Sequence, residues 1–407
     1  MKQYMGDNGI FLDHNVTTPT DKRVVEAMLP YFTEKFATIH SQHSLGKASA
    51  KGVKEAGGHI AKLIGCAHFE LTYTSGGTEA ANMAMKGLEM EYGDQGFEIL
   101  TTRGEHQVIR DLCHYLQQLG CEIRYLPTDK GGMILTEAID DHLNSNTLMV
   151  AIGMVNGETG AIQPIETLGE KVRAKNAVVS QGMPHIAAPV LFVDGSQAVG
   201  RIPVDVVGQR IDMMSFTAHK FYGPMGVGAL YMRTLKPRRV KITQQTHGGM
   251  FQRAMRSGNL NVPGIVGMGE GARIARAEMD EENSRLQKLR DTFEDKLTRL
   301  PGVSIAVKPE HRVPHLTSIR FEDAPTSTLN GHLKRVQASI YSSFASRTDE
   351  GSVVLRRLGF TIKEARETMR FSLGRFTTEQ ELDEAVKDIE QALLTTRQAE
   401  TAAHSGA

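Results

Sequence analysis

The sequence predicts an α/β fold, in which a mostly parallel sheet lies between helices and a smaller C-terminal domain of α+β character follows. Two observations carry this prediction. Short apolar runs alternate with longer amphipathic segments, which is the pattern of βα units. Beyond residue 265 this alternation gives way to one long, charge-rich amphipathic segment, Val266 to Leu300, which predicts a helix leading into a second domain.

The expected elements of the first domain follow one another in βα order. Apolar runs predict strands at Glu70–Thr74, Glu98–Thr101, Glu122–Leu126, Leu148–Ile152, Leu191–Asp194 and Asp212–Phe216. Amphipathic segments predict helices at Thr78–Met90, Gln107–Leu119 and Ile165–Lys175. The stretch from Asn176 to Pro189 contains Gly182 and Pro184, so we expect a loop there.

These patterns divide the chain into four parts. We expect residues 1–15 to pack with the small domain, residues 16–265 to form the large domain and residues 266–395 the small domain. The last residues, 396–407, carry no pattern, and we expect a disordered tail there.

Composition and charge argue against several classes of protein. The 407 residues include 47 Lys and Arg and 47 Asp and Glu, so no net field favours nucleic acid or a membrane surface as a partner. No run of 18 apolar residues occurs and the N-terminus lacks the apolar core of a signal peptide, so we expect a cytoplasmic protein. Cys66, Cys113 and Cys121 are too few for a disulfide framework, and their spacing fits no zinc site, so we expect no metal.

Lys220 and Asp194 are the first candidates for chemistry. Lys220 lies between a buried-looking strand and a glycine-rich turn, where a carbonyl cofactor can reach it to form a Schiff base. Asp194 lies at the carboxyl end of a strand, where α/β proteins bind ligands, and can pair with a protonated pyridine nitrogen or simply shape the turn. Because Lys220 follows 26 residues after Asp194, about one βα unit plus a strand, the two can lie on neighbouring strand ends. Together they indicate pyridoxal 5'-phosphate.

A phosphate site is the second candidate feature. Residues 73–80 leave a strand, turn through Gly76 and Gly77 and begin a helix, so backbone N–H groups and the helix dipole face one point. A plain helix cap by Ser75 or Thr78 explains the same residues equally well. His106 stands at the start of another helix, where a lone histidine is more often a capping or surface residue than a catalytic one.

As a set, these residues resemble the cysteine desulfurase (NifS/IscS-like) family of the class V aminotransferase superfamily, fold type I. The resemblance runs along nearly the whole chain and includes further motifs at Phe11–Pro19, Gly104–His106, Val155–Gly160, His247–Gly249, Met255–Asn259 and Met369–Phe376. It implies pyridoxal 5'-phosphate as cofactor and an amino acid as substrate. It also implies a homodimer in which the phosphate site is shared between subunits.

The resemblance assigns a role to each matching residue. Lys220 would hold the cofactor and move the proton at Cα, and Asp194 would pair with the pyridine nitrogen. His106 would stack on the ring and Gln197 would contact its phenolic oxygen. The residues that would hold the phosphate are Gly77, Thr78, Thr217, His219 and, in place of a threonine from the partner subunit, Asn259.

The substrate side of the resemblance contains both matches and departures. Arg370 would clamp the α-carboxylate, and Asn156 would also contact the substrate. The family carries its sulfur-accepting cysteine in a loop before a segment that matches Val354–Gly359, and counting back without gaps places Phe344 at that position. No cysteine follows Cys121. Two further departures are residues 38–43, where the family has Asn-Pro-Ser-Ser-x-His, and Gly157, where the family has asparagine.

A site without an acceptor thiol keeps Cα deprotonation but loses persulfide formation. We therefore predict carbon–sulfur or other β-lyase chemistry on an amino acid, with a specialised biosynthetic pathway as one setting. The alternatives are a desulfurase that uses an external thiol acceptor, an aminotransferase, decarboxylase or racemase, and a non-catalytic scaffold that binds the cofactor.

Overall fold

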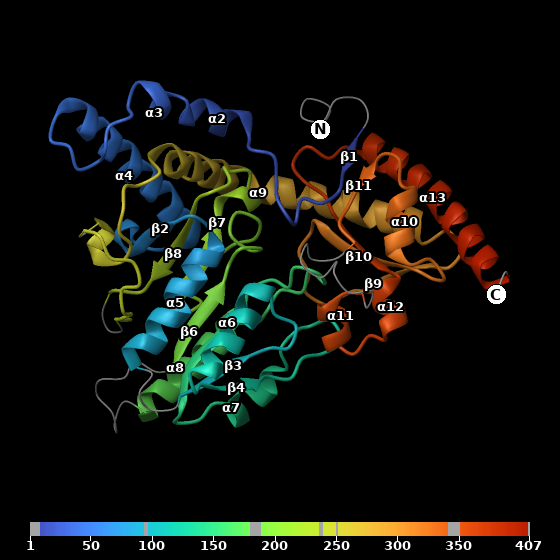
Figure 1. The fold of residues 1–407 in the computed structure, drawn as a ribbon, viewed down its shortest axis with the longest axis horizontal. Coiled ribbons are helices and arrows are strands. Elements are labelled where there is room, and N and C mark those ends of the chain that lie inside the picture. The colour runs from blue at the N-terminus through green and yellow to red at the C-terminus, as the bar shows by residue number, and fades with distance from the viewer. Residues whose placement is uncertain are drawn as a thin grey trace.

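The computed structural model describes residues 9–92, 97–179, 189–235, 239–249, 251–340 and 351–405. Figure 1 shows a large sheet flanked by helices, from which the long helix α9 crosses to the C-terminal part of the chain. Within the described ranges, no helix combines the length and apolarity needed to cross a membrane.

The central sheet has seven strands in the order β2-β8-β7-β6-β5-β3-β4. β8 alone runs opposite to the other six strands, which confirms the predicted mostly parallel sheet. The strand bounds are β2 Leu71–Thr74, β3 Glu98–Thr101, β4 Glu122–Tyr125, β5 Thr147–Gly153, β6 Val190–Asp194, β7 Met213–Thr217 and β8 Gly228–Met232. Each of the six strands expected from the sequence is present within two residues of its expected ends, and β8 was missed.

Helices cover both faces of this sheet because its strands are apolar on both sides. Leu191 and Val193 of β6 face one buried cluster, whereas Val190 and Phe192 face the other. The helices around the sheet are α4 Ser44–Ile64, α5 Gly77–Tyr92, α6 Gln107–Gln118, α7 Ile139–His142 and α8 Ile165–Val179. The three helices predicted around the sheet therefore all form, and α8 continues to Val179, into the stretch expected as a loop.

The C-terminal part has its own antiparallel sheet, in the order β12-β10-β9, built on a core that contains Phe293, Phe321 and Phe371. A short strand near the N-terminus, β1, pairs in parallel with β11. The strands are β1 Ile10–Phe11, β9 Val303–Val307, β10 Leu316–Phe321, β11 Val336–Gln337 and β12 Thr368–Ser372. The remaining helices are α2 Lys22–Met28, α3 Pro30–Thr33, α9 Val262–Leu297, α10 Thr326–His332, α11 Val353–Arg357, α12 Ile362–Arg366 and α13 Glu379–Ser405.

The expected disordered tail is wrong for residues 396–405, because α13 continues to Ser405. Two anchors hold this part of the helix. Thr396 is fully buried. The Arg397 guanidinium donates hydrogen bonds to the carbonyl oxygens of Pro301 and Gly302, just before β9, and of Glu322, just after β10. The domain boundary near residue 265 stays a prediction, since α9 runs unbroken across it.

Candidate active site

The carboxyl ends of four parallel strands, β3, β5, β6 and β7, meet at a cavity of about 480 Å³. This is the edge at which α/β sheets bind ligands, because the loops that follow the strands converge there. The predicted residues that line the cavity are Gly77, Thr78, His106, Asn156, Asp194, Gln197, Thr217, His219, Lys220 and Arg370. Asn259 is not among its lining residues, and Phe344 lies outside the described residues.

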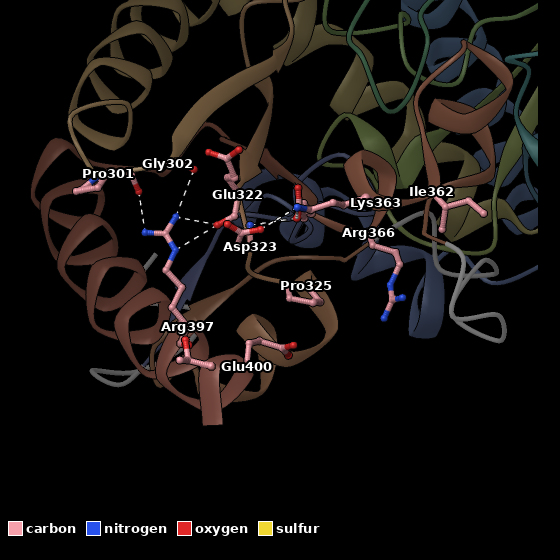
Figure 2. A pocket seen from close by; sticks show the side chains of 12 residues that line it. Pro301, Gly302, Glu322, Asp323, Pro325, Ile362, Lys363, Arg366, Arg397 and Glu400 are labelled. Carbon is pink, nitrogen blue, oxygen red and sulfur yellow. Dashed lines mark hydrogen bonds and ion pairs between the residues drawn. The ribbon is translucent and has the colours of Figure 1, made fainter. Parts of the chain in front are cut away.

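A larger cavity of about 1150 Å³ lies in the C-terminal part of the chain, and none of the predicted site residues lines it. Figure 2 shows that two of its cations serve the fold: Lys363 pairs with Asp323 at 2.8 Å, and Arg397 binds the carbonyl oxygens of Pro301, Gly302 and Glu322. The cavity at the strand ends is therefore the candidate active site.

Lys220 ends the short helical turn Ala218–Lys220 that follows β7. The buried Arg201 fixes this turn by donating from Nε to the Lys220 carbonyl oxygen at 2.9 Å. Burial lowers the pKa of the Lys220 amine to about 8; Asp194 opposes this shift, and Arg201 and Arg370 add to it. A larger fraction of the amine is therefore neutral near neutral pH than in an ordinary lysine, and only the neutral form acts as a nucleophile or base.

Asp194 ends β6, the strand beside β7, in register with Ser215. Its Oδ1 accepts hydrogen bonds from the Ser196 backbone N–H at 2.9 Å and from the Ser215 hydroxyl at 3.4 Å. Both bonds go to one oxygen, so Oδ2 is left to meet a ligand in the cavity. The prediction that Asp194 shapes the turn and the prediction that it serves a ligand are thus compatible.

Gln197 follows Asp194 and reaches the N-terminal segment. Its Nε2 donates to the Asn15 carbonyl oxygen at 3.0 Å, while its Oε1 is buried and has no hydrogen-bond partner. Buried side-chain oxygens are nearly always hydrogen-bonded in native proteins. The orphaned Oε1 therefore indicates a missing donor in this cavity.

Gly77 begins α5 where the chain passes very close to the loop after β6. A Cβ atom at Gly77 would stand 2.8 Å from the Ser196 Oγ, and one at Gly228 would stand 2.7 Å from backbone atoms of Gly76. Side chains at these glycines would therefore push the turn away from its neighbours. The glycines keep the N–H groups at the start of α5 open to the cavity, as an anion site requires.

His106 both caps a helix and lines the cavity. Its Nδ1 accepts a hydrogen bond from the Val108 N–H at 3.2 Å, which confirms the capping interpretation, and its side chain is exposed to the cavity. The surrounding protein atoms remove water from the ring and so lower the pKa of His106, although the charge of Asp194 opposes the shift. A neutral ring with an open face can stack on an aromatic cofactor.

Thr217 and His219 come just before Lys220 in the chain and also line the cavity. The Thr217 hydroxyl donates to the Val227 carbonyl oxygen at 3.4 Å, and the His219 Nδ1 lies 3.0 Å from the Thr17 hydroxyl oxygen. Burial lowers the pKa of His219 to about 4, and the neighbouring cations of Lys220 and Arg201 lower it further. At neutral pH the ring is neutral and can donate only one hydrogen bond.

Arg370 on β12 brings the C-terminal sheet to the cavity. Its Nη2 pairs with Asp13 at 3.1 Å and its Nη1 donates to the Gly157 carbonyl oxygen at 2.9 Å, while its Nε is buried without a partner. Asn156 beside it donates to the Gly104 carbonyl oxygen at 3.1 Å. The guanidinium is thus oriented in advance and keeps a donor unused.

Sequence reasoning did not assign a site role to several residues that line the cavity. Asn15 lies in the motif Phe11–Pro19, and Ser196 lies between the predicted site residues Asp194 and Gln197, so a sequence signal was present for both. Glu158 also belonged to a quoted motif, whereas Arg110 gave no signal except its place one helical turn after His106. The structure brings Arg110 to the cavity through the direction of α6.

The residues of the cavity fit pyridoxal 5'-phosphate. A buried lysine of lowered pKa suits the aldehyde of this cofactor, and a carboxylate with a free oxygen suits its ring nitrogen. A buried amide oxygen without a partner can accept a hydrogen bond from its phenolic hydroxyl, and a glycine turn at a helix start suits its phosphate. The fold and the site together define a pyridoxal-phosphate enzyme of fold type I.

Comparison with known proteins places the chain more narrowly. It belongs to the class V aminotransferase family, whose model matches residues 10–385. Cysteine desulfurase IscS of Photorhabdus laumondii is 38% identical over 387 residues, which cover 94% of this chain and 92% of that protein. Cysteine desulfurase IscS of Methylobacillus flagellatus is 40% identical over 380 residues, which cover 93% and 90%. The chain is a cysteine desulfurase-like enzyme that depends on pyridoxal 5'-phosphate.

Solved structures give the same result. A NifS-like protein superposes with a TM-score of 0.85 at 31% identity and covers 95% of this chain and 100% of that one. DndA from Streptomyces lividans superposes with a TM-score of 0.74 at 30% identity, with coverages of 88% and 97%. The residue roles inferred from the resemblance remain predictions.

Proposed function

We propose that this enzyme is a β-lyase, which removes the Cα proton of an amino acid and expels the substituent at Cβ without passing sulfur to a thiol of its own. When bound, pyridoxal 5'-phosphate supplies an electron sink for the charge that develops at Cα. The observation that carries the proposal is the absence of a cysteine from the lining of the cavity in the described part of the chain.

The three cysteines of the chain are poor sulfur acceptors. Burial raises the pKa of Cys66 and of Cys113 to about 12 each, and that of Cys121 to about 11. Only a thiolate attacks sulfur, and these groups remain thiols at neutral pH. None of them lines the cavity, and no cysteine occurs after Cys121, which includes the region of Phe344.

The chain supplies the other groups that the reaction needs. Arg370 binds the substrate α-carboxylate in this proposal, and Lys220 takes the Cα proton with its neutral amine. Asp194 stabilises a positive charge on the ring nitrogen of the cofactor. His106 stacks on the cofactor ring and limits its motion. With cysteine as the substrate, cysteine and water become pyruvate, ammonia and hydrogen sulfide.

Product analysis tests this proposal. We expect the holoenzyme to release pyruvate and ammonia in equal amounts from at least one member of a panel of β-substituted amino acids that includes cysteine, serine and O-acetylserine. Lys220→Ala serves as the control, because it removes the base and must abolish these products. Formation of alanine, with sulfur transferred to an added thiol, would instead support a desulfurase with an external acceptor and would overturn the proposal.

We also propose that the enzyme is a homodimer in which Asn259 of the partner subunit completes the phosphate site. Within its own chain Asn259 accepts a hydrogen bond from Thr38 at 3.2 Å and does not line the cavity. Leu29, Phe32 and Phe36, in and beside α3, are between 57% and 64% exposed, and such apolar surfaces mark interfaces. Sedimentation is expected to give the mass of two chains, and a single-chain mass would refute the proposal.

A further inference from the structure

Arg110 is a second positive charge in the lining of the cavity, apart from Arg370, and Arg357 lies on α11, a helix that borders the cavity. Arg110 lies on α6, one turn after His106, and lines the cavity. Val354 on α11 also lines it, and Arg357 follows three residues later, on the same face of that helix. The two guanidinium groups are close enough that the charge of Arg357 lowers the pKa of Arg110, after burial as the main cause.

The side chains of Arg110 and Arg357 differ from those of Arg370 and Arg256 in having no partner in the part of the chain that the structure describes. Arg370 pairs with Asp13, and Arg256 pairs with Glu79 at 3.1 Å. Among the described residues, neither the Arg110 nor the Arg357 guanidinium makes a hydrogen bond or an ion pair. Two like charges beside a cavity repel each other unless an anion lies between them.

The carboxyl groups around Arg110 do not fill this role. Glu158 is buried at the wall of the cavity, its carboxylate accepts a hydrogen bond from the Ser352 hydroxyl, and burial raises its pKa. Glu105 accepts hydrogen bonds from the Thr102 hydroxyl and the Gly153 N–H, both at 2.8 Å, and burial raises its pKa to about 8. Asp111 accepts a hydrogen bond from Gln107 at 3.1 Å on the exposed side of α6.

We propose that Arg110 and Arg357 bind an oxyanion on the Cβ substituent of the substrate. The substrate class is then a β-substituted alanine with a phosphate or sulfate ester, held by Arg370 at its carboxylate and by the two arginines at its other end. Guanidinium groups suit this task because their planar N–H donors match the oxygens of such groups. This inference rests on the proposed β-lyase function.

An oxyanion also explains why the site needs no acceptor thiol. In the reaction of O-phosphoserine, the Cα–H bond breaks as Lys220 takes the proton, and the Cβ–O bond breaks with its electron pair leaving on the phosphate. Water then releases ammonia from the resulting enamine, so that O-phosphoserine and water give pyruvate, ammonia and inorganic phosphate. No oxidant or reductant enters, and the two cations stabilise the charge on the leaving group.

The test compares O-phospho-L-serine with O-acetyl-L-serine, whose leaving group carries no charge in the bound substrate. We expect the holoenzyme to favour the phosphate ester in kcat/KM, measured as pyruvate formation. Arg110→Gln and Arg357→Gln should each lower the ratio of the two kcat/KM values by about tenfold, the effect of one lost charged hydrogen-bond donor. Arg299→Gln, on an exposed arginine that lines neither cavity, is the matched control and should leave the ratio unchanged.

Binding separates this inference from the lyase proposal. The dissociation constants of O-phosphoserine and serine, measured from the visible absorbance of the bound cofactor, should differ by at least about tenfold in the wild type and converge in the double variant. If this holds while no pyruvate forms, the oxyanion site stands and the lyase proposal fails. If pyruvate forms from O-acetylserine but both arginine variants leave the ratio unchanged, the oxyanion site is refuted.

Discussion

Lys220→Ala is expected to lower the rate of every amino-acid reaction of this enzyme by about 10³- to 10⁴-fold, the upper range for loss of a positioned acid–base group. Lys220 has two properties that no other residue of the turn Ala218–Lys220 can supply. Burial lowers the pKa of its amine to about 8, and the hydrogen bond from Arg201 to its carbonyl oxygen fixes the turn that carries it. The variant should also lose the covalent attachment of the cofactor.

Borohydride reduction followed by mass spectrometry measures that attachment directly. The wild-type chain should gain the mass of one reduced cofactor at Lys220, and the variant should gain none. Lys288→Ala, which removes an exposed lysine from α9, controls for non-specific reduction and should behave as wild type. A Lys220→Ala protein that kept both its visible absorbance and its turnover would show that Lys220 has no role in the chemistry.

The sequence was sufficient for the parts of the site that follow from strand order. Asp194 and Lys220 could be paired in advance because each comes directly after a buried apolar run, and parallel strands end at the same edge of a sheet. The glycine turn before α5 was recognisable for a similar reason, since Gly76, Gly77 and the helix start are contiguous in the chain.

Contacts between distant segments could not be predicted in this way. The position of Arg357 beside Arg110 depends on the packing of α11 against the loop before His106, where a Cβ atom at Gly104 would stand 3.3 Å from the Leu358 side chain. No local pattern encodes that packing. Strand β8 was missed for a related reason, because it returns antiparallel after a glycine turn and breaks the βα alternation on which the prediction rested.

The same limit applies to the C-terminal tail. Residues 396–405 are rich in alanine and polar groups and show no apolar stripe of their own, so the sequence predicted disorder there. They are helical because the preceding turns of α13 bury Ile389, Ala392 and Leu393 against the C-terminal core, and helix propagation costs little once a helix is anchored.

Asp194→Asn is expected to lower turnover by about 10²- to 10³-fold, the usual cost of removing one well-placed electrostatic partner, while the cofactor stays bound. The amide has nearly the shape of the carboxylate, and its oxygen can still accept the hydrogen bonds from Ser196 and Ser215. It cannot, however, stabilise a proton on a pyridine nitrogen. Borohydride should therefore still fix the cofactor to Lys220, in contrast to Lys220→Ala.

The pH dependence gives this variant a second readout. The charge of Asp194 raises the pKa of Lys220 and of His106, so its removal must lower both. Any limb of the rate profile that reports Lys220 should move from about 8 to lower pH, because the neutral amine is then present over a wider range. Asp141→Asn, on an exposed aspartate at α7, should leave the profile and the rate unchanged. An upward shift, or a normal rate in Asp194→Asn, would mean that the carboxylate shapes the turn and does not serve the cofactor.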